Sequence, residues 1–192
     1  MMPWRRPADL GALLQAGLGI LYPVLVVTST HLFGPFPTLI LVCALLVLGL
    51  TRPSRFMPVD LLWLPVLVVV AVAVVGLLDA ELGVRIYPVA MNVALLGAFA
   101  HSLWHPPSMI ERFARLIDPD LDARGVRYTR KVTMVWVGFF AVNGSLALWF
   151  AVAGSWLEWT IYNGAVAYGL AGLVFAVEYV IRQRVRRRGA AG

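Results

Sequence analysis

Four amide side chains lie deep within apolar stretches of this sequence: Gln15, Asn92, Asn143 and Asn163. A polar group among apolar residues is costly unless it is hydrogen-bonded, so these positions are the first candidates for function. An amide can join neighbouring helices, an interaction worth about 0.6–2 kcal/mol in a membrane. We expect each amide alone to join helices. The alternative is that Asn92, Asn143 and Asn163 together line the polar cavity of a transporter or flippase.

Two charged residues also stand within or beside apolar stretches. Glu178 lies four residues before Arg182, a spacing that predicts an ion pair on one helix face; the alternative is a proton-relay carboxylate. Arg85 opens an apolar stretch, and its candidate ionic partners are Asp79, Glu81 and Glu158.

Two groups of residues have spacings that resemble metal sites. His101 and His105 are four residues apart, which would place both rings on one helix face, but the sequence offers no convincing third zinc ligand. Asp118, Asp120 and Asp122 alternate as at the start of a calcium-binding loop. The glycine and the glutamate that such a loop requires are replaced by alanine and threonine, so we expect a solvated, ion-paired loop. We expect neither a metal nor a cofactor.

The sequence contains no phosphate-binding loop, nucleophile elbow, zinc-protease helix or dinucleotide-binding glycine pattern. Cys43 is the single cysteine, which excludes an internal disulfide and a cysteine-based metal site. A membrane-bound acyl-transfer enzyme is a further alternative. It would require His101, His105 or Glu111 to converge on one cytoplasmic pocket.

Composition indicates where these residues must be placed. The chain has 192 residues, of which 60% are hydrophobic and 14% are charged, and its mean hydropathy is +0.81. A soluble domain is typically about 45–50% apolar and about 25% charged, so a soluble enzyme and a disordered chain are both excluded. The sequence predicts an all-α integral membrane protein, a single domain spanning residues 1–192. Its six apolar stretches are 10–30, 36–50, 61–78, 86–104, 132–153 and 159–181.

These stretches are continuous rather than alternating, which favours transmembrane helices over strands. A helix needs about 20 residues to cross a hydrocarbon core of about 30 Å. The stretch 36–50 is short for this purpose. It is extended by Leu32 and Phe33, crosses a locally thin bilayer, or forms a re-entrant hairpin with the first stretch.

The distribution of basic residues predicts the orientation of the six helices. Arginine and lysine number 16 and the net charge is +6. If the N-terminus is cytoplasmic, 15 of the 16 fall on the cytoplasmic side and only Arg85 falls outside, as the positive-inside rule requires. We therefore expect both termini in the cytoplasm and a multi-pass protein of the bacterial inner membrane. The basic charge is expected to contact lipid rather than nucleic acid.

The longest polar segment, residues 105–131, is predicted to be a cytoplasmic loop between the fourth and fifth helices. Ser108 followed by Glu111 predicts a capping box, and Ile110, Phe113, Ala114 and Ile117 then recur at helical spacing. We expect a short amphipathic helix that lies in the headgroup region, packs on the end of the bundle, or does both. Its candidate docking residues are Ser108, Glu111, Arg112, Phe113 and Arg115.

The fifth apolar stretch carries a distinctive set of side chains. Trp136, Phe139, Asn143, Ala147 and Phe150 share one helix face, which predicts that this face packs inward. The candidate interaction or structural residues of the protein are Trp136, Phe139, Phe140, Asn143, Tyr162, Asn163, Asn92 and Arg85. No catalytic residue is assigned.

The segment YTRKVTMVWVGFFAVNG, residues 128–144, together with WTIYNG, residues 159–164, resembles the intracellular septation protein A family of small bacterial inner-membrane proteins. PPSMIERFARL before it resembles the short basic loop of that family. RIYPVAMN, residues 85–92, together with the HPPSMIERFARL loop and both segments above, is similar to uncharacterised membrane proteins that accompany aryl-polyene and xanthomonadin pigment clusters. In that setting the alternative transporter or flippase would carry a lipid or polyene precursor. Some of those proteins are labelled ketosynthases, but Cys43 lacks the partners that condensation chemistry needs.

The resemblance implies a non-enzymatic role in cell-envelope biogenesis, in the setting of septation or of a pigment pathway. The expected partners are the lipid bilayer and other inner-membrane envelope proteins, with self-association into a homo-oligomer as a further possibility.

Overall fold

The computed structural model describes residues 25–50 and 63–189. Within these ranges the chain is helical and contains no strand, which confirms the all-α prediction. Residues 25–33 are helical and lead into the labelled elements. These are α2 (Pro35–Leu50), α3 (Trp63–Leu78), α4 (Ala80–Arg85), α5 (Tyr87–Trp104), α6 (Met109–Arg115), α7 (Ala123–Val152), α8 (Trp156–Ile161), the π-helical turn η2 (Tyr162–Val166) and α9 (Ala167–Gly189).

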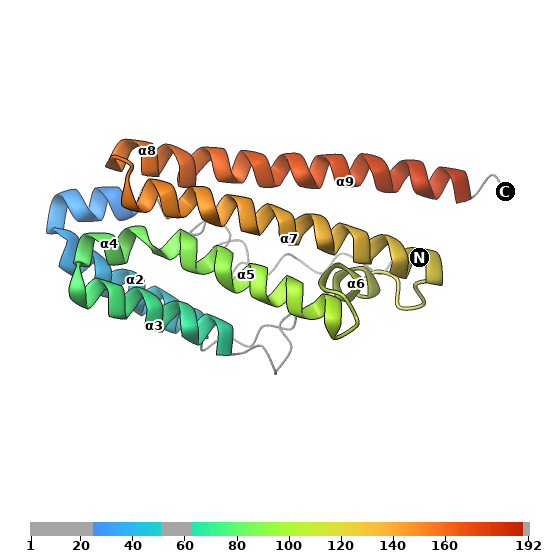
Figure 1. The fold of residues 1–192 in the computed structure, drawn as a ribbon, viewed down its shortest axis with the longest axis horizontal. Helices are drawn as coiled ribbons and strands as arrows, with labels where there is room; N and C mark the ends of the chain where they lie inside the picture. The colour runs from blue at the N-terminus through green and yellow to red at the C-terminus, as the bar shows by residue number, and fades with distance from the viewer. Residues whose placement is uncertain (1–24, 51–62, 190–192) are drawn as a thin grey trace, which may run out of the picture.

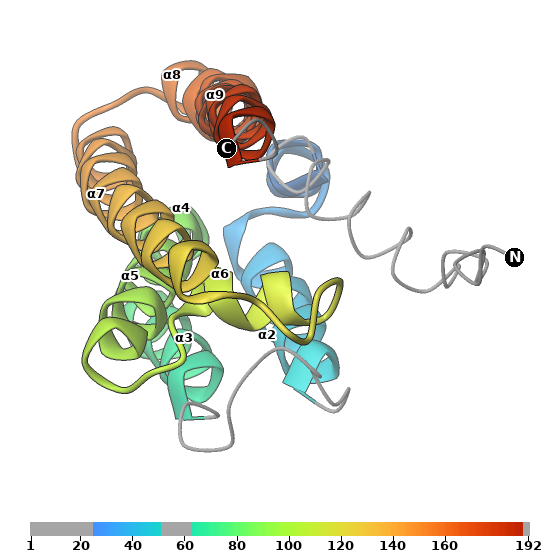
Figure 2. The same cartoon turned by 90° about the vertical axis from the view of Figure 1, so that its right-hand side faces the viewer.

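The helices run roughly parallel to one long axis (Figure 1). α7 and α9 are the two longest and run antiparallel, whereas the short α6 lies across the end of the bundle where α7 begins. The view along the axis shows α3 and α5 on one side of α7 and α9 at the edge of the molecule (Figure 2). Gln15 and most of the predicted first stretch, 10–30, lie outside the described residues.

The predicted stretches 36–50 and 61–78 correspond to α2 and α3. The predicted fourth stretch, 86–104, coincides with α5 but is preceded by the six-residue α4, with Ile86 serving as the end of one helix and the start of the next. Pro88 follows in the first turn of α5, where it has no N–H to give to the carbonyl of Val84. The boundary between α4 and α5 therefore lies directly after Arg85.

α7 begins at Ala123, nine residues before the predicted start of the fifth stretch. The Asp122 carboxylate accepts a hydrogen bond from the Gly125 amide at 2.6 Å and caps this helix. The predicted loop 105–131 is therefore shorter than expected, because its last nine residues extend α7 beyond the apolar stretch. Asp122, the last of the three alternating aspartates, therefore serves as the N-cap of α7.

The predicted sixth stretch, 159–181, lies within a longer helical run from Trp156 to Gly189 that the π-helical turn η2 interrupts. This run starts with a complete capping box. The Ser155 hydroxyl accepts from the Glu158 amide at 3.3 Å, and the Glu158 carboxylate accepts from the Ser155 amide at 2.8 Å.

The interior contains two apolar clusters with a polar layer between them. One cluster, toward α6, gathers Leu64, Ala98, Phe99, Met109, Val132, Trp136 and Phe140. The other, toward α4 and α8, gathers Val26, Leu39, Val42, Val72, Val84, Ala151 and Trp159. Asn92 and Asn143 fall between the two clusters along α5 and α7.

Two described helices are long and apolar enough to cross a membrane, the 30-residue run Ala123–Val152 and the 28-residue run Trp156–Gln183. Pro35–Leu48 and Trp63–Leu78 are apolar but shorter. Along α9 many large apolar side chains are exposed, among them Leu170, Leu173, Phe175, Val177, Tyr179 and Ile181, whereas Ala171 and Val174 pack against the cluster that contains Trp136. No described residue of α9 is buried.

Candidate functional site

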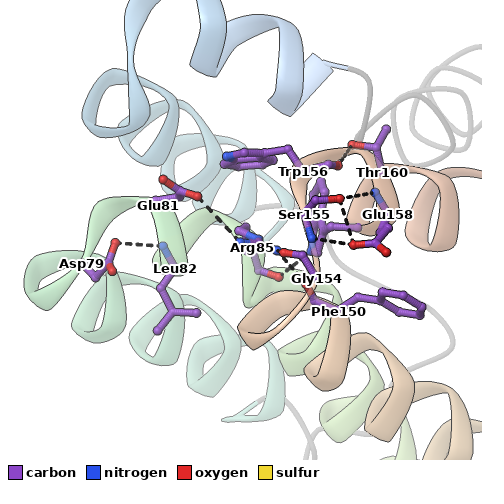
Figure 3. A network of polar contacts seen from close by, with 11 residues as sticks. Asp79, Glu81, Leu82, Arg85, Phe150, Gly154, Ser155, Trp156, Glu158 and Thr160 are labelled. Carbon is purple, nitrogen blue, oxygen red and sulfur yellow. Dashed lines mark hydrogen bonds and ion pairs between the residues drawn. The ribbon is translucent and has the colours of Figure 1, made fainter.

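Arg85, at the end of α4, is the centre of a network of polar contacts (Figure 3). It is 9% exposed and points at the end of α7. One of its terminal nitrogens, Nη2, donates to the carbonyl of Phe150 at 2.7 Å and also to the carbonyl of Gly154. The last carbonyls of a helix have no partners within the helix and carry the negative end of its dipole. The guanidinium therefore caps the C-terminus of α7 from a different helix.

Three further contacts surround Arg85, and we call this set, with the two carbonyls, the Arg85 junction. Arg85 Nη1 lies 3.6 Å from the Glu81 carboxylate, so one of its three candidate ionic partners is confirmed. The centre of the guanidinium lies 5.3 Å from the Trp156 ring centroid, within cation–π range. The indole N–H of Trp159 donates to the Arg85 carbonyl at 3.0 Å. Arg85 thus joins α4, the end of α7 and the start of α8.

The other two candidate partners of Arg85 have different roles. Asp79 accepts from the Leu82 amide at 3.0 Å and caps α4, and Glu158 is occupied by the Ser155 capping box. Both contacts are visible around the junction in Figure 3. Of the three candidates, only Glu81 pairs with Arg85, and the Arg85 junction links α4 to the turn between α7 and α8.

The structure brings three predicted site residues together in a hydrogen-bonded chain that we call the amide bridge. The Asn143 amide nitrogen donates to Asn92 Oδ1 at 2.9 Å. The Tyr162 hydroxyl donates to Asn143 Oδ1 at 2.8 Å. Asn92 in turn donates to the Pro88 carbonyl at 2.8 Å. All three side chains are buried, so the amide bridge connects α5, α7 and η2 in the interior.

Two local features make the amide bridge possible. Gly144 lies beside Asn92, and a Cβ at position 144 would lie 3.0 Å from the Asn92 Cβ, so the missing side chain allows close approach of α5 and α7. The π-helical turn widens the last helix, and the consecutive residues Tyr162 and Asn163 are both buried there. Such turns are frequently found at functional sites.

Asn163 does not join the amide bridge. Its amide nitrogen donates to the carbonyl of Trp159, one turn earlier in the same run, at 2.9 Å. Asn92 and Asn143 hydrogen-bond each other across two helices, whereas Asn163 hydrogen-bonds a backbone carbonyl of its own helical run. The three amides that a transport cavity would share are thus divided between two separate networks.

The aromatic residues predicted in the fifth apolar stretch form a cluster with those of two other helices. Phe140 packs edge-on against Phe99 of α5 with ring centroids 5.1 Å apart. Trp136 contacts Phe139 at 5.3 Å and Phe175 of α9 at 4.6 Å. The predicted inward face of this helix is confirmed, since Trp136, Asn143 and Ala147 are buried.

The predicted capping box at Ser108 is wrong. Ser108 stands at the N-cap of α6, but its hydroxyl makes no cap hydrogen bond. Two other amides of the first turn are bonded by neighbouring helices. The Met109 amide donates to the hydroxyl of Ser102 on α5 at 2.9 Å, and the Ile110 amide donates to the hydroxyl of Thr133 on α7 at 3.2 Å. These two hydrogen bonds hold α6 against the end of the bundle, which is one of the two placements expected for this helix.

The structure also separates the candidate docking residues of this helix. Ser108 and Glu111 are buried, and Glu111 pairs with Arg115 at 2.8 Å. Arg112 donates to the Pro107 carbonyl at 2.9 Å, and Arg115 also donates to the Pro119 carbonyl at 3.0 Å. Phe113, with Leu116 and Ile117 beyond it, remains exposed at the surface.

The histidine pair forms a stack rather than a chelate, because the rings of His101 and His105 lie 4.0 Å apart and nearly parallel. In the described parts of the chain, no three His, Cys, Asp or Glu residues gather closely enough to hold a metal ion. The predicted ion pair of Glu178 with Arg182 is confirmed by contacts of 2.8 and 2.9 Å.

Three important residues escaped the sequence analysis: Ser102, Thr133 and Trp159. Each is fully buried and hydrogen-bonds a residue of another element. The presence of a hydroxyl or an indole in an apolar helix was the only available signal, and it did not identify the partner.

Comparison with protein families, curated proteins and solved structures yields no match for this chain. The geometry alone therefore defines the arrangement: a helical bundle whose deep polar side chains hold its own helices together.

Proposed function

We propose that this protein is a six-helix protein of the bacterial inner membrane that acts as a non-enzymatic scaffold in cell-envelope biogenesis. The membrane placement is supported by the apolar surface of α9, whose side chains Leu173, Phe175 and Val177 are all exposed. A soluble monomer rarely exposes a continuous apolar surface along a whole helix, because it would be aggregation-prone.

The orientation is supported by charge. The first part of α7 contains Arg124, Arg127, Arg130 and Lys131, and the last part of α9, which ends at Gly189, contains Arg182 and four further arginines. The basic residues of both helices therefore lie at the same end of the bundle. α2 and α3 have 16 residues each and reach about 24 Å at 1.5 Å per residue. Such short helices fit a locally thinned bilayer. Both termini then lie in the cytoplasm.

The observation that carries the non-enzymatic role is how the deep polar groups are used. Asn92, Asn143 and Tyr162 bond to each other, and Arg85 bonds to the end of α7. A catalytic or transport site instead needs polar groups that are directed at a substrate. These side chains stabilise one arrangement of the helices, which suits a scaffold that presents surfaces to partners.

The contact surface for a partner is the exposed apolar side of the α6 region at the cytoplasmic end. Phe113, Leu116 and Ile117 are exposed there beside Arg112 and Arg115, which gives the mixture of apolar and basic groups found at interfaces. Because Ser102 and Thr133 hold α6 in place, this surface is rigid before a partner binds. The resemblance to septation protein A supports the envelope setting.

The orientation is tested by labelling single cysteines in a Cys43→Ser background. Leu157→Cys, in the exposed first turn of α8, should react in intact cells with a maleimide that does not cross membranes. Asp118→Cys, in the loop after α6, should react only after the inner membrane is permeabilised. Labelling of both positions from the same side would contradict the proposed arrangement.

The scaffold role is tested by photo-crosslinking in living cells. A benzophenone amino acid at Phe113 should give adducts with specific inner-membrane proteins, identified by mass spectrometry. The same group at Val142, an exposed apolar position on α7, is the matched control and should give lipid adducts. If Phe113 gives only lipid as well, α6 is a membrane-surface helix and the scaffold proposal fails.

A further inference from the structure

An apolar groove of about 320 Å³ runs between α7 and α9. Its volume lies in the range of pockets that hold small ligands. The two helices run antiparallel (Figure 1), and the lining residues Tyr128 and Val132 place the groove in the part of the bundle where α7 begins. Its walls are Tyr128, Val132, Val135, Leu173, Val174, Val177, Glu178 and Ile181.

The groove has one apolar and one polar end. Valine, leucine and isoleucine form most of it, whereas Tyr128 and Glu178 mark the cytoplasmic end. There the Tyr128 hydroxyl donates to Glu178 Oε1 at 3.2 Å, and Arg182 holds the same carboxylate through two contacts. The carboxylate is thus neutralised by an arginine of its own helix and presents little net negative charge to the groove.

Two cations flank this polar end. Arg124 lies four residues before Tyr128 and Lys131 lies three residues after it, spacings that place all three on one face of α7. Arg124 and Lys131 are exposed, and neither makes a hydrogen bond or ion pair with another described residue. Arg127 lies on this face too, three residues after Arg124 and four before Lys131, whereas the exposed Arg130 is turned by about 160° from Tyr128 and donates to the Leu103 carbonyl at 2.7 Å.

We infer that this groove binds an anionic glycerophospholipid. One acyl chain lies along the valines and leucines, and the phosphate lies near Arg124, Lys131 and Arg182. The aliphatic walls select a hydrocarbon chain, and the flanking cations select a negative headgroup over a zwitterionic one. The inference rests on the proposed membrane placement and adds a defined ligand to it.

The test is native mass spectrometry of the full chain, delipidated and then incubated with phosphatidylglycerol and phosphatidylcholine of identical acyl chains. One phosphatidylglycerol should bind per chain in preference to phosphatidylcholine. A charge near the membrane surface contributes about fivefold in affinity, so Arg124→Gln and Lys131→Gln should each weaken binding about fivefold. Arg130→Gln, on the opposite face of α7, is the matched charge control and should bind as the unchanged protein does.

A second pair of variants tests the groove itself without changing charge. Val177→Phe fills the groove and should abolish the preferential binding. Ala176→Phe places the same ring on the neighbouring exposed position, outside the groove, and should leave binding intact. Inorganic phosphate at the same concentration should not displace the lipid, because it has no acyl chain.

Equal retention of both lipids, or unchanged binding by Val177→Phe, would overturn the inference. Displacement by inorganic phosphate would show that the cations bind the headgroup alone and would also overturn it. These outcomes leave the labelling of Leu157→Cys and Asp118→Cys unaffected, so failure of the lipid site is distinguishable from failure of the membrane placement.

Discussion

Replacement of Arg85 by methionine removes the guanidinium of the Arg85 junction but keeps a stem of similar length. The carbonyls of Phe150 and Gly154 then lose the donor that satisfies them. A hydrogen bond to a charged group contributes about 1.5–3 kcal/mol, so the loss of two is expected to cost about 3–6 kcal/mol of unfolding free energy.

The other contacts of Arg85 are weaker. The Glu81 carboxylate is 3.6 Å away and its side chain is 48% exposed, so this ion pair contributes less than about 1 kcal/mol. The contact with the Trp156 ring contributes about 1 kcal/mol. The hydrogen bonds to the end of α7 therefore dominate, and Arg85→Lys should fall in between, at about 1.5–3 kcal/mol, since an ammonium cannot reproduce both bonds.

The measurement is reversible unfolding of the purified protein in mixed dodecylmaltoside and sodium dodecyl sulfate micelles, followed by tryptophan fluorescence. Glu81→Gln is the matched control, because it preserves shape and removes only the 3.6 Å ion pair. The reasoning is refuted if Arg85→Met stays within about 1 kcal/mol of the unchanged protein, or if Glu81→Gln costs as much as Arg85→Met.

Three further changes test other parts of the bundle. Tyr162→Phe removes one donor of the amide bridge and should lower the free energy of unfolding by about 1–2 kcal/mol. When it is combined with Asn143→Ala in the same unfolding assay, the loss should be smaller than the sum of the two single losses. Additive losses would contradict the shared hydrogen bond. Ser155→Ala should cost about 1 kcal/mol through loss of the capping box, seen as a lowered Tm; an unchanged Tm would mean that the box is not needed. Gly83→Ala should strongly lower the stability of the fold, because the added Cβ would lie 2.3 Å from the backbone of α3. Gly138→Ala is the control: its Cβ meets open space, so the change should be neutral or stabilising by up to about 1 kcal/mol. Equal Tm values for the two variants would contradict the close approach of α3 and α4.

Much of the architecture follows from patterns that are local in the chain. The apolar stretches 36–50 and 61–78 match α2 and α3, and the inward face of α7 follows from residues three and four apart. The pair of Glu178 with Arg182 was predictable for the same reason, since both side chains belong to one helix turn. The early start of α7 was not expected, because the apolar stretch begins only at Val132, whereas the helix begins at Ala123.

The central residues of the Arg85 junction and the amide bridge could be predicted from the sequence, but their hydrogen-bond partners could not. Asn92, Asn143, Tyr162 and Arg85 were all recognised as unusual residues, yet their types do not reveal their partners. At Ser108 a familiar local pattern misled, because the Ser108 hydroxyl makes no cap hydrogen bond and Ser102 and Thr133 instead bond the amides of Met109 and Ile110. Hydroxyls of neighbouring helices, rather than the local box, hold the start of α6.

The sequence by itself determined that the chain is helical, which residues are apolar, which helix faces turn inward and which charges pair within one helix, because each depends on neighbours less than about two turns away. Only the tertiary structure decided that Arg85 meets carbonyls 65 and 69 residues later, and that Asn143 lies between Asn92 and Tyr162. Those contacts depend on how far each helix is rotated and shifted against the next. Packing of the whole bundle sets these two quantities, and no local spacing encodes them.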